Sequence, residues 1–190
     1  MEQLIPIKDL VARVQSYNPR TDVKKLRAAY DYAKKAHAGQ RRRSGEPYFT
    51  HPVAVAALLA EQRLDDATII TALLHDTVED TATTRDELRR IFSPRIARIV
   101  AEVTDNKRLK KATRKRMQIK RAGRASQEAR YVKLADKICN LRDILRRPPA
   151  GWDVKRRREY FDWSKRVVDR LRGTSSRLEA RFDAVYRRKP

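Results

Sequence analysis

Two histidines and two aspartates lie where an ionisable side chain needs a partner. His75 and Asp76 are adjacent and are expected in the middle of one helix, directly after its apolar run of residues 69–74. His51 precedes a proline at the expected start of another helix, and Asp136 lies in a largely apolar helical stretch. Burying such groups is costly unless they are paired or coordinated to a metal.

Together these four residues offer two imidazole nitrogens and two carboxylates, which are donors that suit divalent cations. Four protein donors leave coordination positions for a water and a phosphate oxygen, as a catalytic metal site requires. A His-Asp dipeptide on its own is also typical of a hydrogen-bonded pair in a core. With His51 and Asp136 in comparable helical surroundings, the pattern favours one divalent cation.

Further polar residues fall one helical turn from these candidates. Glu79 and Asp80 follow His75 and Asp76 by four residues each, so both acids are expected beside the metal without being ligands. One acid would orient or deprotonate an attacking water, and the other would assist proton transfer. Asn140 and Asp143 share a helical face with Asp136. The competing interpretations are a solvated acidic helix end and ordinary helix polarity.

The elements that must position these residues are helices. Apolar residues recur at helical spacing along most of the chain, which predicts an all-α bundle of roughly eight to ten helices. Helix starts are predicted at residues that favour the N-cap: Asp65 or Asp66, Thr84, Ser93, Ser126, Asp153 and Ser175. Residues 39–50 are the least helical part, where we expect a small β-hairpin or a loop. Without repeats or a flexible linker, residues 1–190 are predicted to form a single domain.

The composition is that of a globular protein with a strongly cationic surface. The 190 residues include 46 Lys+Arg against 24 Asp+Glu, a formal net charge of +22. Such a surface attracts polyanions, including nucleotides and nucleic acids. No apolar run approaches the length of a membrane span and no signal peptide is recognisable, so a cytoplasmic protein without membrane association is expected. Cys139 is the only cysteine and is expected in the core.

Positive charge is densest in residues 107–124, which contain ten basic residues and no acidic one. One interpretation is a solvated cationic helix face that steers a polyphosphate toward the site. The other is contact with an additional anionic partner such as tRNA.

Five sequence motifs extend the metal and acid candidates into a family resemblance. They are RRRSGEPYFTHP (residues 41–52), ALLHDTVEDT (72–81), VTDNK (103–107), KLADKICNLRD (133–143) and GWDVKRRREYFDW (151–163). In this order they resemble the HD-type hydrolase domain of the Rel/SpoT alarmone enzymes, and especially the stand-alone small alarmone hydrolases of metazoan type. The resemblance covers about residues 33–178.

The resemblance implies a manganese-dependent hydrolase that removes the 3′-pyrophosphate of guanosine tetra- or pentaphosphate. It implies metal ligands at His51, His75, Asp76 and Asp136, and a catalytic acid pair at Glu79 and Asp80. The implied substrate-binding positions are Arg42, Arg43, Ser44, Lys111, Asn140, Arg156 and Tyr160. His37 is not among the implied ligands, and we expect it in the core or behind the site.

The chain departs from the family in the nucleotide loop, where Arg42-Arg43 stands for the usual Arg-Lys and keeps the charge but not the geometry. No synthetase domain fits in the residues outside the resemblance, so degradation alone is expected.

Two alternative functions remain open at this level. The same chemistry would serve adenosine analogues, NADPH or pyrophosphorylated tRNA. An all-α nucleic-acid-binding module would also explain the +22 charge, although it would have no use for the metal and acid residues. The sequence does not indicate an oligomeric state.

Overall fold

The computed structural model describes residues 4–190, which fold into eleven helices joined by turns and loops. The helices are α1 (Ile7–Gln15), α2 (Val23–Ala36), α3 (Thr50–Ala60), α4 (Asp66–Leu74), α5 (Thr77–Asp80), α6 (Arg85–Ile91), α7 (Pro94–Val103), α8 (Lys111–Ala122), α9 (Gln127–Arg146), α10 (Val154–Asp169) and α11 (Ser176–Tyr186). The all-α prediction is confirmed, and the count of eleven includes α5, which is a single turn.

The predicted N-caps set where several helices begin. The side chains of Asp65, Ser93 and Ser126 each accept a hydrogen bond from the backbone N–H three residues further on. These bonds satisfy donors that a helix start would otherwise leave unpaired. Short polar signals in the sequence therefore fix the starts of α4, α7 and α9, three of the helices around the site.

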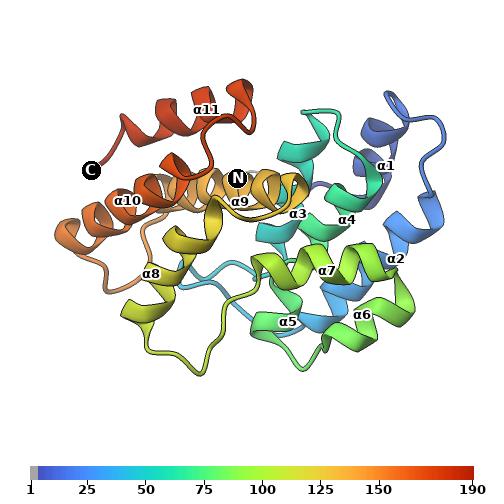
Figure 1. Ribbon diagram of the computed structural model, residues 1–190, viewed down its shortest axis with the longest axis horizontal. Helices are drawn as coiled ribbons and strands as arrows, with labels where there is room; N and C mark the ends of the chain where they lie inside the picture. Colours follow the sequence, from blue (N-terminus) through green and yellow to red (C-terminus); the bar gives the residue numbers. More distant parts are fainter. Residues whose placement is uncertain (1–3) are drawn as a thin grey trace.

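Helix α9 is the centre of the packing. It runs lengthwise through the molecule and contacts α3, α4, α7, α10 and α11 (Figure 1). Helices α3 and α4 pack against each other and are apolar nearly all round, so both are almost wholly buried. Polar residues on or beside these helices are consequently held in a rigid, desolvated setting.

Residues 39–49 form a loop that covers one edge of the site. The expected hairpin is reduced to one isolated antiparallel bridge between Arg41 and Pro47. Gly45 makes the tight turn with a φ of 90°, a conformation that favours glycine. The turn is closed by the hydrogen bond from Arg42 N to Glu46 O, 2.8 Å long. Within residues 4–190, no helix is long and apolar enough to cross a bilayer.

Candidate active site

His51, His75 and Asp136 converge from three helical segments. His51 lies in the first turn of α3, His75 follows the last residue of α4, and Asp136 is in the middle of α9. One ligand atom from each lies within 4.8 Å of the other two. Both histidines are buried. The three side chains form a site that can hold a divalent cation.

Asp76 extends this cluster. His51 Nε2 lies 3.0 Å from Asp136 Oδ1 and 4.0 Å from Asp76 Oδ2, while His75 Nε2 lies 3.2 Å from Asp76 Oδ1 and 3.9 Å from Asp136 Oδ1. Ligand atoms bound about 2.1 Å from one ion lie roughly 3 to 4.2 Å from each other by simple geometry. All four separations fall within that range, but those of Asp76 involve its two different oxygens, so Asp76 lies directly beside the group formed by His51, His75 and Asp136.

The ring of His75 is oriented for coordination by its other nitrogen. Nδ1 lies 2.8 Å from the backbone carbonyl of Ala72 and must donate a hydrogen to it, because a carbonyl only accepts. In the neutral ring, Nε2 is then left with its lone pair. Among residues 4–190 no hydrogen-bond partner reaches this buried Nε2. A buried acceptor without a donor is what a metal ligand leaves in the protein alone.

The surroundings keep Asp136 charged despite its burial. Burial disfavours the anion, but Lys137 and the hydrogen bond with His51 hold the pKa of Asp136 well below its usual range. Lys137 Nζ lies 2.9 Å from Asp136 Oδ2, and this carboxylate raises the pKa of Lys137 although burial opposes it. Burial and the nearby Arg42 lower the pKa of His51, which favours the neutral, ligating imidazole.

The helix that carries His75 and Asp76 differs from the sequence expectation of one continuous helix. Helix α4 ends at Leu74, His75 is its C-cap, and Asp76 precedes the single turn α5. Thr77 Oγ1 donates to the freed carbonyl of Leu74 at 2.7 Å. Helix α4 is interrupted where the chain leaves the apolar core. The interruption allows the side chains of His75 and Asp76 to face the same cluster.

Glu79 and Asp80 lie on α5 beside the cluster, as expected, but their surroundings differ. Asp80 accepts a hydrogen bond from Tyr48 Oη at 2.8 Å and forms an ion pair with Lys107. Glu79 Oε2 accepts a hydrogen bond from the backbone N–H of Asp105 at 3.0 Å. Burial is the main reason that the pKa of Glu79 rises from 4.5 to about 7. Glu79 is therefore suited to hold a proton near neutral pH.

Tyr48 is a site residue that the sequence motifs contained without indicating its role. Its hydroxyl lies 2.7 Å from Asp76 Oδ2 and 2.8 Å from Asp80 Oδ2, so it bridges a cluster carboxylate and an acid of α5. Burial and the two carboxylates raise the pKa of Tyr48, which keeps the hydroxyl protonated as a donor. His37 is buried and stacks on the Tyr48 ring with a centroid distance of 4.8 Å.

A cavity of about 380 Å³ opens over the cluster. Most of the expected substrate-binding residues line it, namely Arg42, Arg43, Ser44, Asn140 and Tyr160. Arg42 is not free: it donates to Asn140 Oδ1 at 2.8 Å and pairs with Asp143 at 3.1 Å. Asn140 in turn donates to Asp136. The nucleotide loop is thereby linked to the cluster through one side-chain network.

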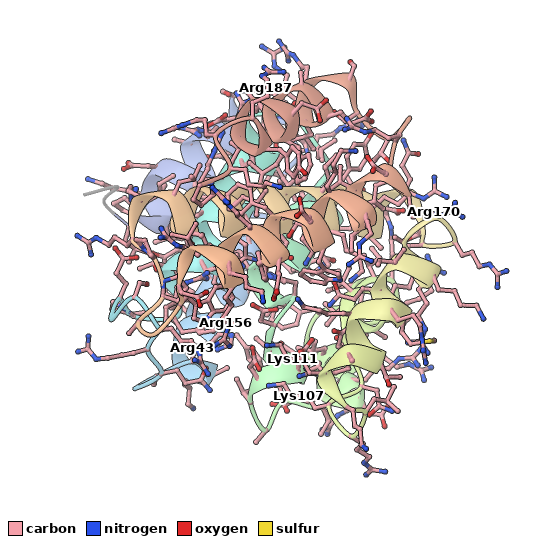
Figure 2. All side chains as sticks on the ribbon, turned by 90° about the vertical axis from the view of Figure 1, so that its left-hand side faces the viewer. Arg43, Lys107, Lys111, Arg156, Arg170 and Arg187 are labelled. Carbon is pink, nitrogen blue, oxygen red and sulfur yellow. The ribbon has the colours of Figure 1, made fainter. Side chains whose placement is uncertain are left out.

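The other two expected residues, Lys111 and Arg156, line a second cavity of about 450 Å³. This cavity adjoins the first, because Glu79, Tyr160 and other residues line both. Figure 2 shows Arg43, Arg156, Lys111 and Lys107 on the same side of the molecule, with Arg187 at the opposite edge. The site therefore offers a connected space with acids and the cluster at its floor and cations around it.

The fold and the cluster define the class of protein. A model of the HD domain family matches residues 29–162, and the chain belongs to this family. It is 46% identical to a zebrafish (Danio rerio) protein named guanosine-3′,5′-bis(diphosphate) 3′-pyrophosphohydrolase MESH1, over 82% of this chain and 89% of that one. The human protein of the same name is 43% identical over 89% of this chain and 97% of that one.

A solved structure shows the same architecture. It is described as a metazoan orthologue of SpoT that hydrolyses ppGpp, and it superposes with a TM-score of 0.84. That protein is 41% identical to this one, and the match covers 86% of this chain and 94% of the other.

Replacing Tyr48 with phenylalanine tests the carboxylate bridge. Tyr48→Phe leaves Asp76 and Asp80 without this donor, and we expect the metal-free protein to lose about 1–3 kcal/mol of unfolding free energy at pH 7. Because the donor stabilises ionised aspartate, the loss should shrink as the pH falls below about 4. Urea denaturation at several pH values measures it.

Tyr30→Phe is the matched control for that measurement, since the Tyr30 hydroxyl donates to the backbone carbonyl of Ile5 at 3.3 Å, an acceptor that does not titrate. Its effect should not depend on pH in this range. A Tyr48→Phe protein as stable as the wild type would contradict the bridge.

The raised pKa of Glu79 predicts a pH-dependent cost of folding. The folded protein holds this proton up to about pH 7, whereas an unfolded glutamate releases it near 4.5. The unfolding free energy should therefore fall with rising pH between these values, by up to about 3 kcal/mol relative to Glu79→Gln. Denaturation of both metal-free proteins checks this, with the exposed Glu159→Gln as control. Parallel curves for wild type and Glu79→Gln would refute it.

Proposed function

We propose that this chain hydrolyses guanosine 3′,5′-bis(diphosphate) and its pentaphosphate analogue at the 3′ position, releasing pyrophosphate and leaving GDP or GTP. The observation that carries the proposal is the His/Asp cluster flanked by two acids at the floor of a cation-lined cavity. Relatives that are 43–46% identical over most of their length bear this activity in their names. The cation we propose is Mn²⁺, held by His51, His75, Asp76 and Asp136.

In the hydrolysis, the oxygen of water bonds to the phosphorus that carries the ribose 3′ oxygen. The bond between that phosphorus and the 3′ oxygen breaks. A bound divalent cation would polarise phosphate oxygens and acidify water. The proton released by water is taken by Asp80, whose position Tyr48 and Lys107 fix. Glu79, with its pKa near 7, supplies a proton to the departing 3′ oxygen. Both acids thus have roles that match their surroundings.

The substrate would lie across the two adjoining cavities. Arg42, Arg43 and Ser44 would contact the nucleoside from the loop, together with Asn140. Lys111, Arg156 and Tyr160 would bind phosphates in the second cavity, where an arginine fork suits a phosphate group. The cationic rim would also raise the local concentration of such a polyanion. We place this enzyme in the cytoplasm, where soluble nucleotides are found.

Asp80→Ala should lower kcat for guanosine tetraphosphate by at least about 10³-fold, because the position loses its general base. The folded structure and Mn²⁺ binding should persist. The assay is manganese-dependent release of pyrophosphate, run beside the adenosine counterpart and NADPH. Asp31→Ala, an exposed aspartate of α2, should retain wild-type rates. Near wild-type turnover by Asp80→Ala would refute its assignment as the general base. Release of orthophosphate from NADPH, without hydrolysis of guanosine tetraphosphate, would show that NADPH is the substrate.

A second proposal concerns the exposed cations in and beside α8, since the ion pair of Arg114 with Glu79 involves a partly buried residue of this helix. Seven exposed basic residues in and beside it form no ion pair with any of residues 4–190; we call them the α8 basic face, and they are Arg108, Lys110, Lys111, Arg116, Lys120, Arg121 and Arg124. Arg116, Lys120 and Arg124 follow one another at four-residue spacing, so like charges repel along this side. We propose that RNA such as tRNA binds here, since phosphates would relieve that repulsion.

The fourfold variant Arg116→Gln, Lys120→Gln, Arg121→Gln and Arg124→Gln should bind a fluorescent single-stranded RNA more weakly. It should also reduce the slope of log K against log salt by up to about 2.8, which is about 0.7 for each RNA phosphate that the variant no longer neutralises. Fluorescence anisotropy at several salt concentrations gives both values. The control removes four exposed cations of α2, at Lys24, Arg27, Lys34 and Lys35. Equal losses in both variants would show a net-charge effect and refute a defined RNA surface.

A further inference from the structure

A buried lysine lies in the wall of the cavity that holds the His/Asp cluster. Lys133, on α9, is 7% exposed and lines this cavity. Its Nζ donates to the backbone carbonyl of Val103 at 3.2 Å. No carboxylate among residues 4–190 lies within ion-pair distance of it. A desolvated ammonium without a counter-ion is a costly arrangement that calls for an explanation.

The bond to Val103 explains only part of this arrangement. Val103 is the last residue of α7, so the lysine satisfies a carbonyl at a helix C-terminus and favours the helix dipole. An ammonium has three N–H donors, however, and this bond uses one. The other N–H donors of Lys133 and its positive charge are therefore available at the cavity that this side chain lines.

Other cations of the same cavity wall are neutralised or solvated. Lys137 pairs with Asp136, Arg42 with Asp143, and Arg147 with Glu46. Arg41 and Arg43 are exposed on the loop. Lys133 is therefore the buried cation of this wall that has no ion-pair partner among the described residues. The charged groups that act on it are Lys137, Asp105, Asp136 and Glu79, and burial lowers its pKa.

We propose that Lys133 binds a non-bridging oxygen of the diphosphate that is removed, next to the His/Asp cluster. The inference rests on the proposed function in taking the 3′-diphosphate as the group bound in this cavity. A phosphate oxygen supplies both the missing acceptor and the missing negative charge. Lys133 thus holds the same group as the cluster does, from the α9 side of the cavity, and the bond to Val103 fixes the amine between α7 and α9.

Lys133→Met tests this inference, because methionine keeps much of the buried stem and removes the charge. In the Mn²⁺-loaded protein, titration calorimetry with manganese pyrophosphate should show binding about 10- to 100-fold weaker than in the wild type. Mn²⁺ affinity, measured separately by electron paramagnetic resonance, should change less than about twofold. Lys34→Met is the control for lost charge, since Lys34 is an exposed residue of α2 that lines neither cavity, and it should weaken binding far less.

Unchanged pyrophosphate affinity in Lys133→Met would overturn the proposal. Equal losses of Mn²⁺ and pyrophosphate affinity would also overturn it, because they would indicate a structural role alone. These measurements need no turnover, so their outcome is separate from the substrate assay. A wild-type protein that fails to hydrolyse guanosine tetraphosphate would refute the proposed substrate. The phosphate contact of Lys133 would still be decided by the pyrophosphate and Mn²⁺ affinities.

Discussion

The structure depends on keeping one carboxylate charged inside the protein. Asp136 is in the middle of α9, the helix on which five others pack, and its charge is largely removed from water and must be compensated by protein groups. Lys137, His51 and Asn140 surround it with an ion pair and hydrogen bonds from α9 itself and from α3. The helices that carry these compensating side chains are packed in the core. The site is therefore held in place by the same packing as the core around it.

That constraint explains why the residues of the cluster come from apolar helices. Helices α3 and α4 are buried almost entirely, and each carries its histidine at an end, where backbone groups are available. The carbonyl of Ala72 fixes the ring of His75, and the interruption before α5 turns Asp76 into the same space. The acids then differ in environment, since Asp80 is held by Tyr48 and Lys107 while Glu79 is desolvated beside Asp105.

The excess positive charge is distributed unevenly over the molecule. Beside the cluster several cations are paired with carboxylates, as Arg42 is with Asp143, and they serve to position side chains. Along α8 the exposed cations have no such partners among the described residues, so that surface keeps its long-range attraction for anions. Lys133 combines both situations, because it is buried beside the cluster and has no ion-pair partner among the described residues. The positive charge can thus draw in a polyphosphate and also hold it.

Much of this protein was determined by short-range patterns in its sequence. Helical apolar spacing predicted the all-α fold, and capping residues such as Ser93 and Ser126 predicted helix starts, because both depend on residues within one or two turns. The motifs also indicated the residues of the cluster. Only the tertiary structure decided that Tyr48 joins Asp76 to Asp80 and that α4 is interrupted before Asp76. It alone separated Lys133 from Lys137, which look equivalent on one apolar helix. These features depend on distances between segments remote in the chain, and no local preference encodes such distances.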